Sequence, residues 1–162
     1  MATVPYTHIL CHFQYSIRSL FVRYTYELRG PAADPSIDIR LEEQHIDLRP
    51  PKFDQLEEKF ICDINPSGEV PVLISKGDGS VLPDSRAITF EIAKYYPQLM
   101  PEDHVDEIHR LLAKLHEIDF YSLTFTAKYM FPCGTIATLL GRRNHADTSD
   151  RYRQALDRKI DQ

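Results

Sequence analysis

The chain has 162 residues, 43% of them hydrophobic and 27% charged, and a formal net charge of -5. This is an ordinary globular composition, sufficient for one domain or a small pair. The acidic balance argues against nucleic acid or an anionic membrane as the main partner, and no apolar run approaches the roughly 20 residues of a membrane helix.

The ends and the cysteines favour a reducing, cytoplasmic setting. The N-terminal stretch MATVPYTHIL lacks the basic flank and long apolar region of a signal peptide. The three cysteines, Cys11, Cys62 and Cys133, are far apart and form neither a CxxC pair nor a metal-like cluster. We therefore expect unpaired thiols and no bound metal.

The first hundred residues alternate between strand and helix patterns. Apolar spacing and turn residues predict, in chain order, a strand over 6–13, a helix over 16–29, a strand over 38–48, a helix over 53–62, strands over 70–75 and 80–83, and a helix over 84–96. Alternating strands and helices imply a parallel pair, and the GDG turn at 77–79 adds an antiparallel pair. This order predicts a thioredoxin-like α/β domain with a mixed four-stranded sheet.

The pattern changes after Pro101. Apolar residues recur at helical spacing from Val105 to Leu115, and a further helix is expected from about Ser149 to the end. The short Pro-rich stretch from about Tyr96 to Pro101 reads as a linker. We therefore expect a thioredoxin-like domain over 1–97 and an all-α C-terminal domain over 101–162.

Three stretches in order, YSIRSLFVRYTYELRG, NPSGEVPVL and LPDSRAITFEIAKYYP, resemble the N-terminal domain of a glutathione transferase. The likeness covers about the first hundred residues, and the helical remainder is similar to the family's second domain only in outline and is shorter. The resemblance implies glutathione as co-substrate, a small hydrophobic electrophile and a homodimer.

By this resemblance, Ser16 is the residue that holds the glutathione thiol. A free thiol has a pKa of roughly 8.5 and reacts as the thiolate, which a hydroxyl hydrogen bond and a helix N-terminus both favour. Arg18 and Arg23 could add to the local field. The alternative is that Ser16 is only a helix N-cap, and Tyr15 and Ser19 are rival hydroxyls.

Two neighbouring residues are less suited to catalysis. His12 falls roughly where tyrosine-type members of the family keep their tyrosine, so a tyrosine mechanism is not supported. Cys11 is expected to be a small core residue. Without a cysteine pair, a thioredoxin-type redox function is a weak third hypothesis.

Pro71 and the residues that open the helix at 84–96 complete the predicted site. The resemblance implies a cis bond between Val70 and Pro71, so that the Val70 backbone pairs with an extended peptide; the alternative is that Pro71 simply begins a strand. Ser85 is predicted as an N-cap that binds the γ-glutamyl carboxylate, and Asp84 as the acceptor for its ammonium group. The alternative is a plain cap with an acidic neighbour.

The glycyl end of the site departs from the family pattern. Glu69 stands where many relatives carry a basic or amide residue and would repel the carboxylate if it pointed inward. Lys52, Lys59 or His45 could compensate.

Aromatic residues of the C-terminal part are candidates for the second substrate site, although such a stretch belongs to a core more often than to a pocket. They are Tyr121, Phe125, Tyr129, Met130 and Phe131. The leading hypothesis is a glutathione transferase, which performs conjugation, peroxide reduction or isomerisation. The alternative is a non-catalytic module of the same fold, for ligand binding or protein assembly.

Overall fold

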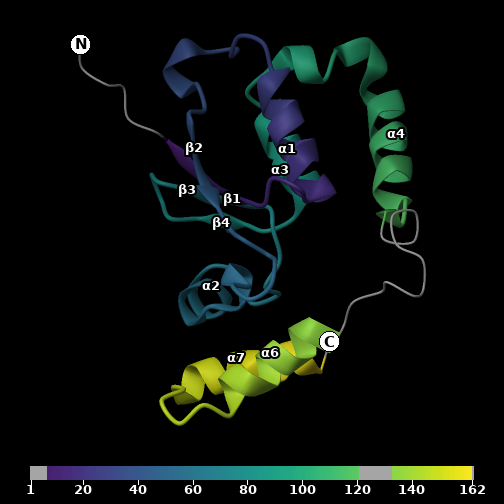
Figure 1. Cartoon of the computed structure of the whole chain (residues 1–162). Helices are drawn as coiled ribbons and strands as arrows, with labels where there is room; N and C mark the ends of the chain where they lie inside the picture. The colour runs from purple at the N-terminus through teal and green to yellow at the C-terminus, as the bar shows by residue number, and fades with distance from the viewer. Residues whose placement is uncertain (1–6, 121–132, 162) are drawn as a thin grey trace. The chain divides into compact units, whose positions relative to one another are not determined.

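The computed structural model describes residues 7–120 and 133–161, which form two compact units (Figure 1). The sheet unit comprises residues 1–45 and 70–124, and the helical unit comprises residues 46–69 and 125–162. The chain was expected to divide into domains over 1–97 and 101–162, whereas the compact units combine separate stretches of the chain. The expected domain organisation stays a prediction.

The sheet unit is built on a four-stranded mixed sheet with the strand order β2-β1-β3-β4. Strand β1 (His8–His12) runs parallel to β2 (Leu41–His45) and antiparallel to β3 (Val72–Ser75), which pairs in turn with β4 (Val81–Leu82). A parallel pair needs a crossover, which α1 (Ile17–Glu27) supplies, whereas β3 and β4 need only a tight turn. The predicted thioredoxin-like arrangement is therefore confirmed.

Helices α1 and α3 (Ser85–Ala93) cover one face of this sheet (Figure 1). The hydrophobic core between them draws side chains from all these elements and from the segments that flank β2 and α3: Leu10, Val22, Ile39, Leu41, Leu73, Ile88, Ile92 and Tyr96. Burial of these side chains is the main favourable contribution to folding of the unit.

The stop predicted after α1 depends on glycine. Gly30 has φ +68°, a left-handed conformation that glycine adopts without a Cβ penalty. A Cβ at this position would also lie 2.0 Å from Oε1 of Gln98. The Gln98 amide is the end of a flexible side chain and can move aside, so the positive φ is what favours glycine here.

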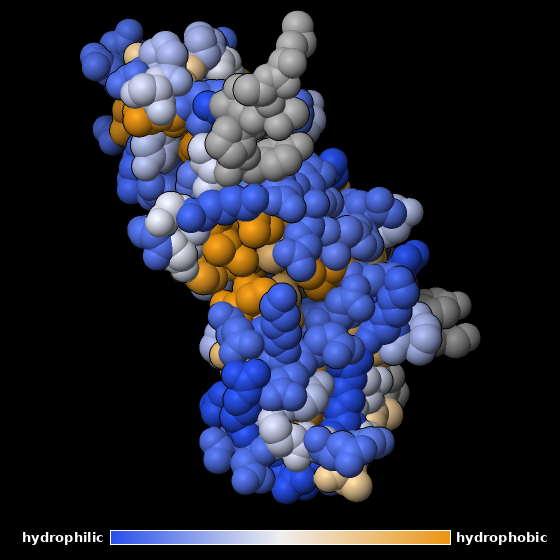
Figure 2. Space-filling view, turned by 90° about the vertical axis from the view of Figure 1, so that its left-hand side faces the viewer, coloured by the Kyte–Doolittle hydropathy of each residue, from blue (hydrophilic) through white to orange (hydrophobic). Residues whose placement is uncertain are grey.

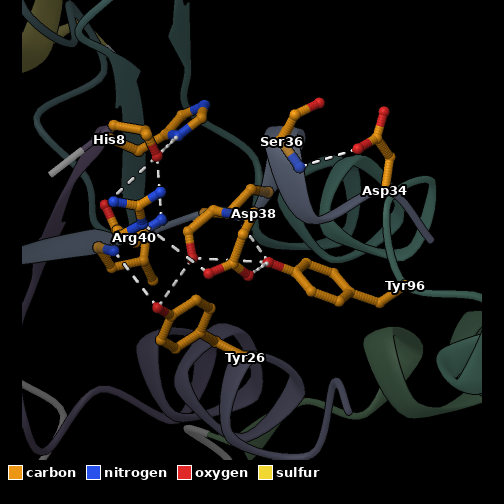
Figure 3. Close-up of polar contacts among 10 residues, drawn as sticks. His8, Tyr26, Asp34, Ser36, Asp38, Arg40 and Tyr96 are labelled. Carbon is orange, nitrogen blue, oxygen red and sulfur yellow. Dashed lines mark hydrogen bonds and ion pairs between the residues drawn. The ribbon is translucent and has the colours of Figure 1, made fainter. Parts of the chain in front are cut away.

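Buried tyrosine hydroxyls fix the chain segment that enters β2 (Figure 3). The Tyr96 hydroxyl accepts the Ile39 N–H at 2.8 Å and donates to Oδ1 of Asp38 at 2.8 Å. The Tyr26 hydroxyl donates to the Ile39 carbonyl at 3.0 Å. These bonds satisfy backbone groups that the sheet leaves unpaired, and so they position β2 against α1 and α3.

The helical unit packs α2 (Glu58–Asp63) with α6 (Cys133–Arg143) and α7 (Asp150–Ile160). Its core consists of Phe53, Leu56, Ile61, Leu139, Ala155 and Leu156. Polar contacts reinforce the packing: Arg151 binds Glu58 at 2.9 Å and Asp63 at 2.7 Å, and Ser149 donates to Glu58 at 2.7 Å.

Several predicted bounds are corrected. The helix expected over 53–62 begins only at Glu58, because Phe53 has φ 46° and a 3-10 turn, Asp54–Leu56, comes first. The strand expected over 38–48 is limited to Leu41–His45, where it pairs with β1. Helix α6 was not predicted, whereas α7 begins after Ser149 as expected.

The remaining elements of the sheet unit are helical. Helix α4 (Val105–Glu117) covers the stretch where helical spacing was predicted from Val105. Short 3-10 helices lie at Pro35–Ile37, Pro97–Leu99 and Glu102–His104. No helix within the described residues is long and apolar enough to span a membrane.

The surface seen in Figure 2 is mainly hydrophilic, with apolar areas between the charged side chains. Helix α1 and its C-cap also expose apolar side chains on successive turns, namely Ile17, Leu20, Tyr24 and Leu28. The apolar spacing that predicted this helix therefore includes residues outside the core.

Candidate functional site

One edge of the sheet brings together the three segments that the sequence singled out. Because β1 and β3 are antiparallel, the end of β1 lies beside the start of β3, and β4 ends at the same edge. The loop to Ser16, the Val70–Pro71 segment and the turn into Asp84 and Ser85 therefore all meet the sheet at this edge.

Ser16 is the N-cap of α1, as the simpler interpretation of this residue predicted. Its Oγ accepts the Ser19 N–H at 3.4 Å. A hydroxyl has two lone pairs and one proton, so this bond leaves the proton available to a second acceptor. The cap and a thiol-binding role are therefore compatible.

The rival hydroxyls are less suited to hold a thiol at this place. The Ser19 side chain is buried, and its Oγ accepts the Phe13 N–H at 3.3 Å, which ties it to the backbone. Tyr15 is 67% exposed, and its ring packs edge-on against Phe13 with the centroids 5.4 Å apart.

The bond between Val70 and Pro71 is cis, as the resemblance implied. Both residues are buried, and Pro71 comes directly before β3. The structure thus places this dipeptide at the edge where Ser16 begins α1.

The prediction that Ser85 is the N-cap of α3 is wrong. Asp84 is the N-cap of α3, because its Oδ1 accepts the Ala87 N–H at 2.7 Å. Ser85 is the first helical residue and is buried, and its Oγ lies 3.5 Å from Nε2 of His116. The sequence DSRA allowed either cap, since both residue types are strong N-caps.

His116 is a residue of the site that sequence reasoning missed. Its Nδ1 donates to the Leu112 carbonyl at 2.8 Å, so neutral His116 presents the lone pair of Nε2 to the Ser85 hydroxyl. Its backbone carbonyl accepts from Nη2 of Arg18 at 2.9 Å. His116 thereby links the starts of α1 and α3. In the sequence it was one polar residue near the end of an amphipathic helix, a pattern without a specific signal.

Arg23, by contrast, is neutralised by a partner. Its Nε lies 3.1 Å from Oε1 of Glu43, whose other oxygen lies 3.3 Å from Nε2 of His12. Burial lowers the pKa of His12, although Glu43 partly opposes this effect. Burial also raises the pKa of the Cys11 thiol to about 11, in agreement with the predicted core role.

Lys52 and Glu69 belong to the helical unit. The Lys52 ammonium lies 3.7 Å from Asp47, and Arg49 beside it holds the pKa of the Asp47 carboxyl well below its usual range. Glu69 is exposed, and its backbone carbonyl accepts from Nδ2 of Asn65 at 2.9 Å. Their predicted contribution at the glycyl end stays a prediction.

The same unit contains an open hollow of about 410 Å³. It is lined by Glu57, Glu58, Gly141, Arg142, His145, Asp147, Thr148 and Tyr152. None of these residues was predicted as a site residue. The predicted aromatic candidates, Tyr121, Phe125, Tyr129, Met130 and Phe131, lie outside the described residues.

Solved structures show what this fold is. A glutathione transferase homologue from Sulfitobacter with bound glutathione is 14% identical, with a TM-score of 0.51 over 98% of this chain and 64% of that one. The beta-etherase LigF from Sphingobium sp. strain SYK-6 is 21% identical, with a TM-score of 0.62 over 95% and 69% of the two chains. A possible glutathione S-transferase from Rhodopseudomonas palustris is 19% identical, with a TM-score of 0.56 over 96% and 84%.

The chain therefore has the fold of the glutathione transferases, with a thioredoxin-like sheet followed by helices. It spans about 64% of the length of the Sulfitobacter protein. No protein-family model matches the sequence, and no curated protein matches it significantly.

Proposed function

We propose that this protein is a glutathione transferase that activates the glutathione thiol in the sheet unit for attack on a small hydrophobic electrophile. The observation that carries the proposal is the meeting of Ser16, Val70–Pro71 and Asp84–Ser85 at one edge of a glutathione transferase-like sheet. A tripeptide that lies across this edge would touch all three segments.

Each segment has a distinct role in the proposed complex. Ser16 keeps its cap bond and donates its proton to the thiolate, which lowers the pKa of the bound thiol. The Val70 backbone pairs with the cysteinyl part of the peptide. The free N–H groups at the start of α3 bind the γ-glutamyl carboxylate, while Asp84 accepts from the ammonium group.

The proposed reaction is conjugation, peroxide reduction or glutathione-assisted isomerisation, with the electrophile deciding among them. The resemblance further supports a cytoplasmic homodimer, and the exposed apolar residues of α1 supply surface for such an association.

Replacement of Ser16 tests the thiolate step. Ser16→Ala should raise the pKa of the bound glutathione thiol and reduce turnover at neutral pH, with little change in glutathione affinity. Ser16→Thr, which keeps a hydroxyl and a helix cap, is the matched control. The thiolate absorbance of bound glutathione is titrated against pH, and kcat is measured beside it. Unchanged activity of Ser16→Ala would shift the role to Tyr15.

The second candidate is a non-catalytic module that binds ligands or partner proteins. The cap bond of Ser16 and the exposed Glu69 carboxylate favour it, because neither feature needs a catalytic role. Retention on glutathione-agarose together with turnover of a chloro-nitrobenzene electrophile supports the enzyme. Retention without turnover, or no retention, supports the module.

A further inference from the structure

Arg18 carries a charge that no described carboxylate neutralises. Among residues 7–120 and 133–161 no aspartate or glutamate forms an ion pair with it, whereas Arg23 on the same helix binds Glu43. Its Nη1 is buried and has no hydrogen-bond partner. The undescribed segments 1–6 and 121–132 contain no aspartate or glutamate in their sequence. A buried donor without a partner costs free energy, and an anion that accepts from it would remove that cost.

The surroundings of Arg18 hold the guanidinium in place and are aromatic. The His116 carbonyl accepts from Nη2 at 2.9 Å, and the Phe21 and Phe120 rings lie 5.9 and 5.7 Å from Cζ. Such rings attract the cation and offer apolar surface to a neighbouring aromatic ligand. The ring of Phe21 also lies 5.5 Å from that of His116.

We propose that Arg18 is the anchor of a second-substrate site that takes aromatic carboxylates. The ligand carboxylate accepts from Nη1 of Arg18, and its ring packs beside Phe21 and Phe120. Arg18 is only half-buried, so a small movement of its side chain brings Nη1 within reach of an entering oxygen.

A carboxylate fits this place better than a phosphate dianion. Nη2 of Arg18 already donates to the His116 carbonyl, and the apolar rings of Phe21 and Phe120 lie near the guanidinium. A planar carboxylate carries one negative charge and therefore loses less hydration there than a phosphate dianion does. Its hydrogen bonds to the guanidinium are also charge-assisted. The assignment of this ligand as the electrophile rests on the proposed function, whereas the binding step itself does not require glutathione.

Binding without glutathione therefore tests the site separately from catalysis. Calorimetric titration in low-chloride buffer compares 2-naphthoate with 2-naphthamide, which share a ring and differ in charge. We expect the wild-type protein to bind naphthoate about tenfold more tightly, as one charge-assisted bond predicts. Arg18→Met should remove the preference, and Arg18→Lys should keep part of it. Arg23→Met is the matched control and should leave the preference unchanged.

Equal affinity for the two ligands in the wild-type protein overturns the proposal, and so does a preference that survives in folded Arg18→Met. Thermal unfolding of each variant verifies the fold. If naphthoate binds as expected while glutathione-agarose retains nothing, the anion site stands and the transferase function fails. If glutathione is turned over but the protein shows no preference for naphthoate, the transferase function stands and the anion site fails.

Discussion

Asp84 caps α3 in the structure, and the proposed function gives the same side chain a second, ligand-binding role. Its Oδ1 caps α3 through the Ala87 N–H, and the proposed complex assigns the same carboxylate to the glutathione ammonium group. A helix cap needs only an acceptor oxygen, whereas an ammonium partner benefits from negative charge. The two roles can therefore be separated by substitution.

Asp84→Asn should keep the cap and lower glutathione affinity, because the amide oxygen still accepts the Ala87 N–H but carries no charge. Asp84→Ala should also lose about 1 kcal/mol of unfolding free energy. Urea unfolding and calorimetric titration with glutathione measure the two effects. Full glutathione affinity in Asp84→Asn would contradict the ammonium contact.

Cys11 is a buried thiol, and its environment makes it a poor nucleophile. Burial raises the pKa of its thiol from about 9 to about 11, so the reactive thiolate is about a hundredfold scarcer than for an unburied thiol. In the native protein at pH 8, iodoacetamide should leave Cys11 unmodified while it labels the partly exposed Cys62. Peptide mass spectrometry locates the label, and labelling in urea is the control. Rapid native modification of Cys11 would reopen a nucleophilic role.

At the scale of elements, the entry to β2 depends on hydroxyl groups rather than on strand pairing. The Tyr96 hydroxyl satisfies the Ile39 N–H and binds Asp38 in a buried position (Figure 3). Burial raises the pKa of Tyr96, and the bond to Asp38 acts in the same direction. The hydroxyl is therefore the protonated donor that this geometry needs.

Tyr96→Phe should destabilise the protein by about 1–3 kcal/mol, because it leaves a buried N–H without an acceptor. Tyr24→Phe on exposed α1 is the matched control and should change stability by less than about 0.5 kcal/mol. Urea unfolding at neutral pH measures both. Equal effects of the two substitutions would mean that the hydroxyl network contributes nothing.

At the scale of the whole molecule, the sheet unit was predictable and the helical unit only in part. Apolar alternation and turn residues indicated each strand. Successive side chains of a strand point to opposite faces of the sheet, so a half-buried strand alternates apolar and polar residues. The start of α2 was missed, because a left-handed Phe53 is not encoded in apolar spacing. Helix α6 was missed because its sequence, CGTIATLLGRR, contains two glycines and two threonines, which are poor helix formers.

The candidate site was predictable where a motif covers adjacent residues, and not where distant elements meet. Ser16, Pro71 and Asp84 stood in recognisable stretches. His116 and Phe120 join Arg18 only through tertiary packing, which leaves no trace in local spacing. The choice between Asp84 and Ser85 as cap was equally beyond the sequence, because either residue satisfies the helix.

Acid should destabilise the whole protein in a predictable direction. Burial lowers the pKa of His8 and His12, so folding opposes their protonation as the pH falls below about 6.5. Hydrogen bonds lower the pKa of Glu58 and bring that of Asp78 to about 2. A carboxylate whose pKa is lower in the folded state than in the unfolded state stabilises the protein at a pH above the unfolded-state pKa. This stabilisation is lost as the pH falls through the folded-state pKa.

The unfolding free energy should therefore decrease continuously from pH 7 to pH 2, first through the histidines and then through the carboxylates. Urea titrations at pH 7.5, 5.5 and 3.5 measure the slope. His12→Gln should flatten it between pH 7.5 and 5.5, because one buried imidazole no longer resists protonation. A slope that is flat or rises toward acid would show that burial of His8 and His12 does not govern their protonation.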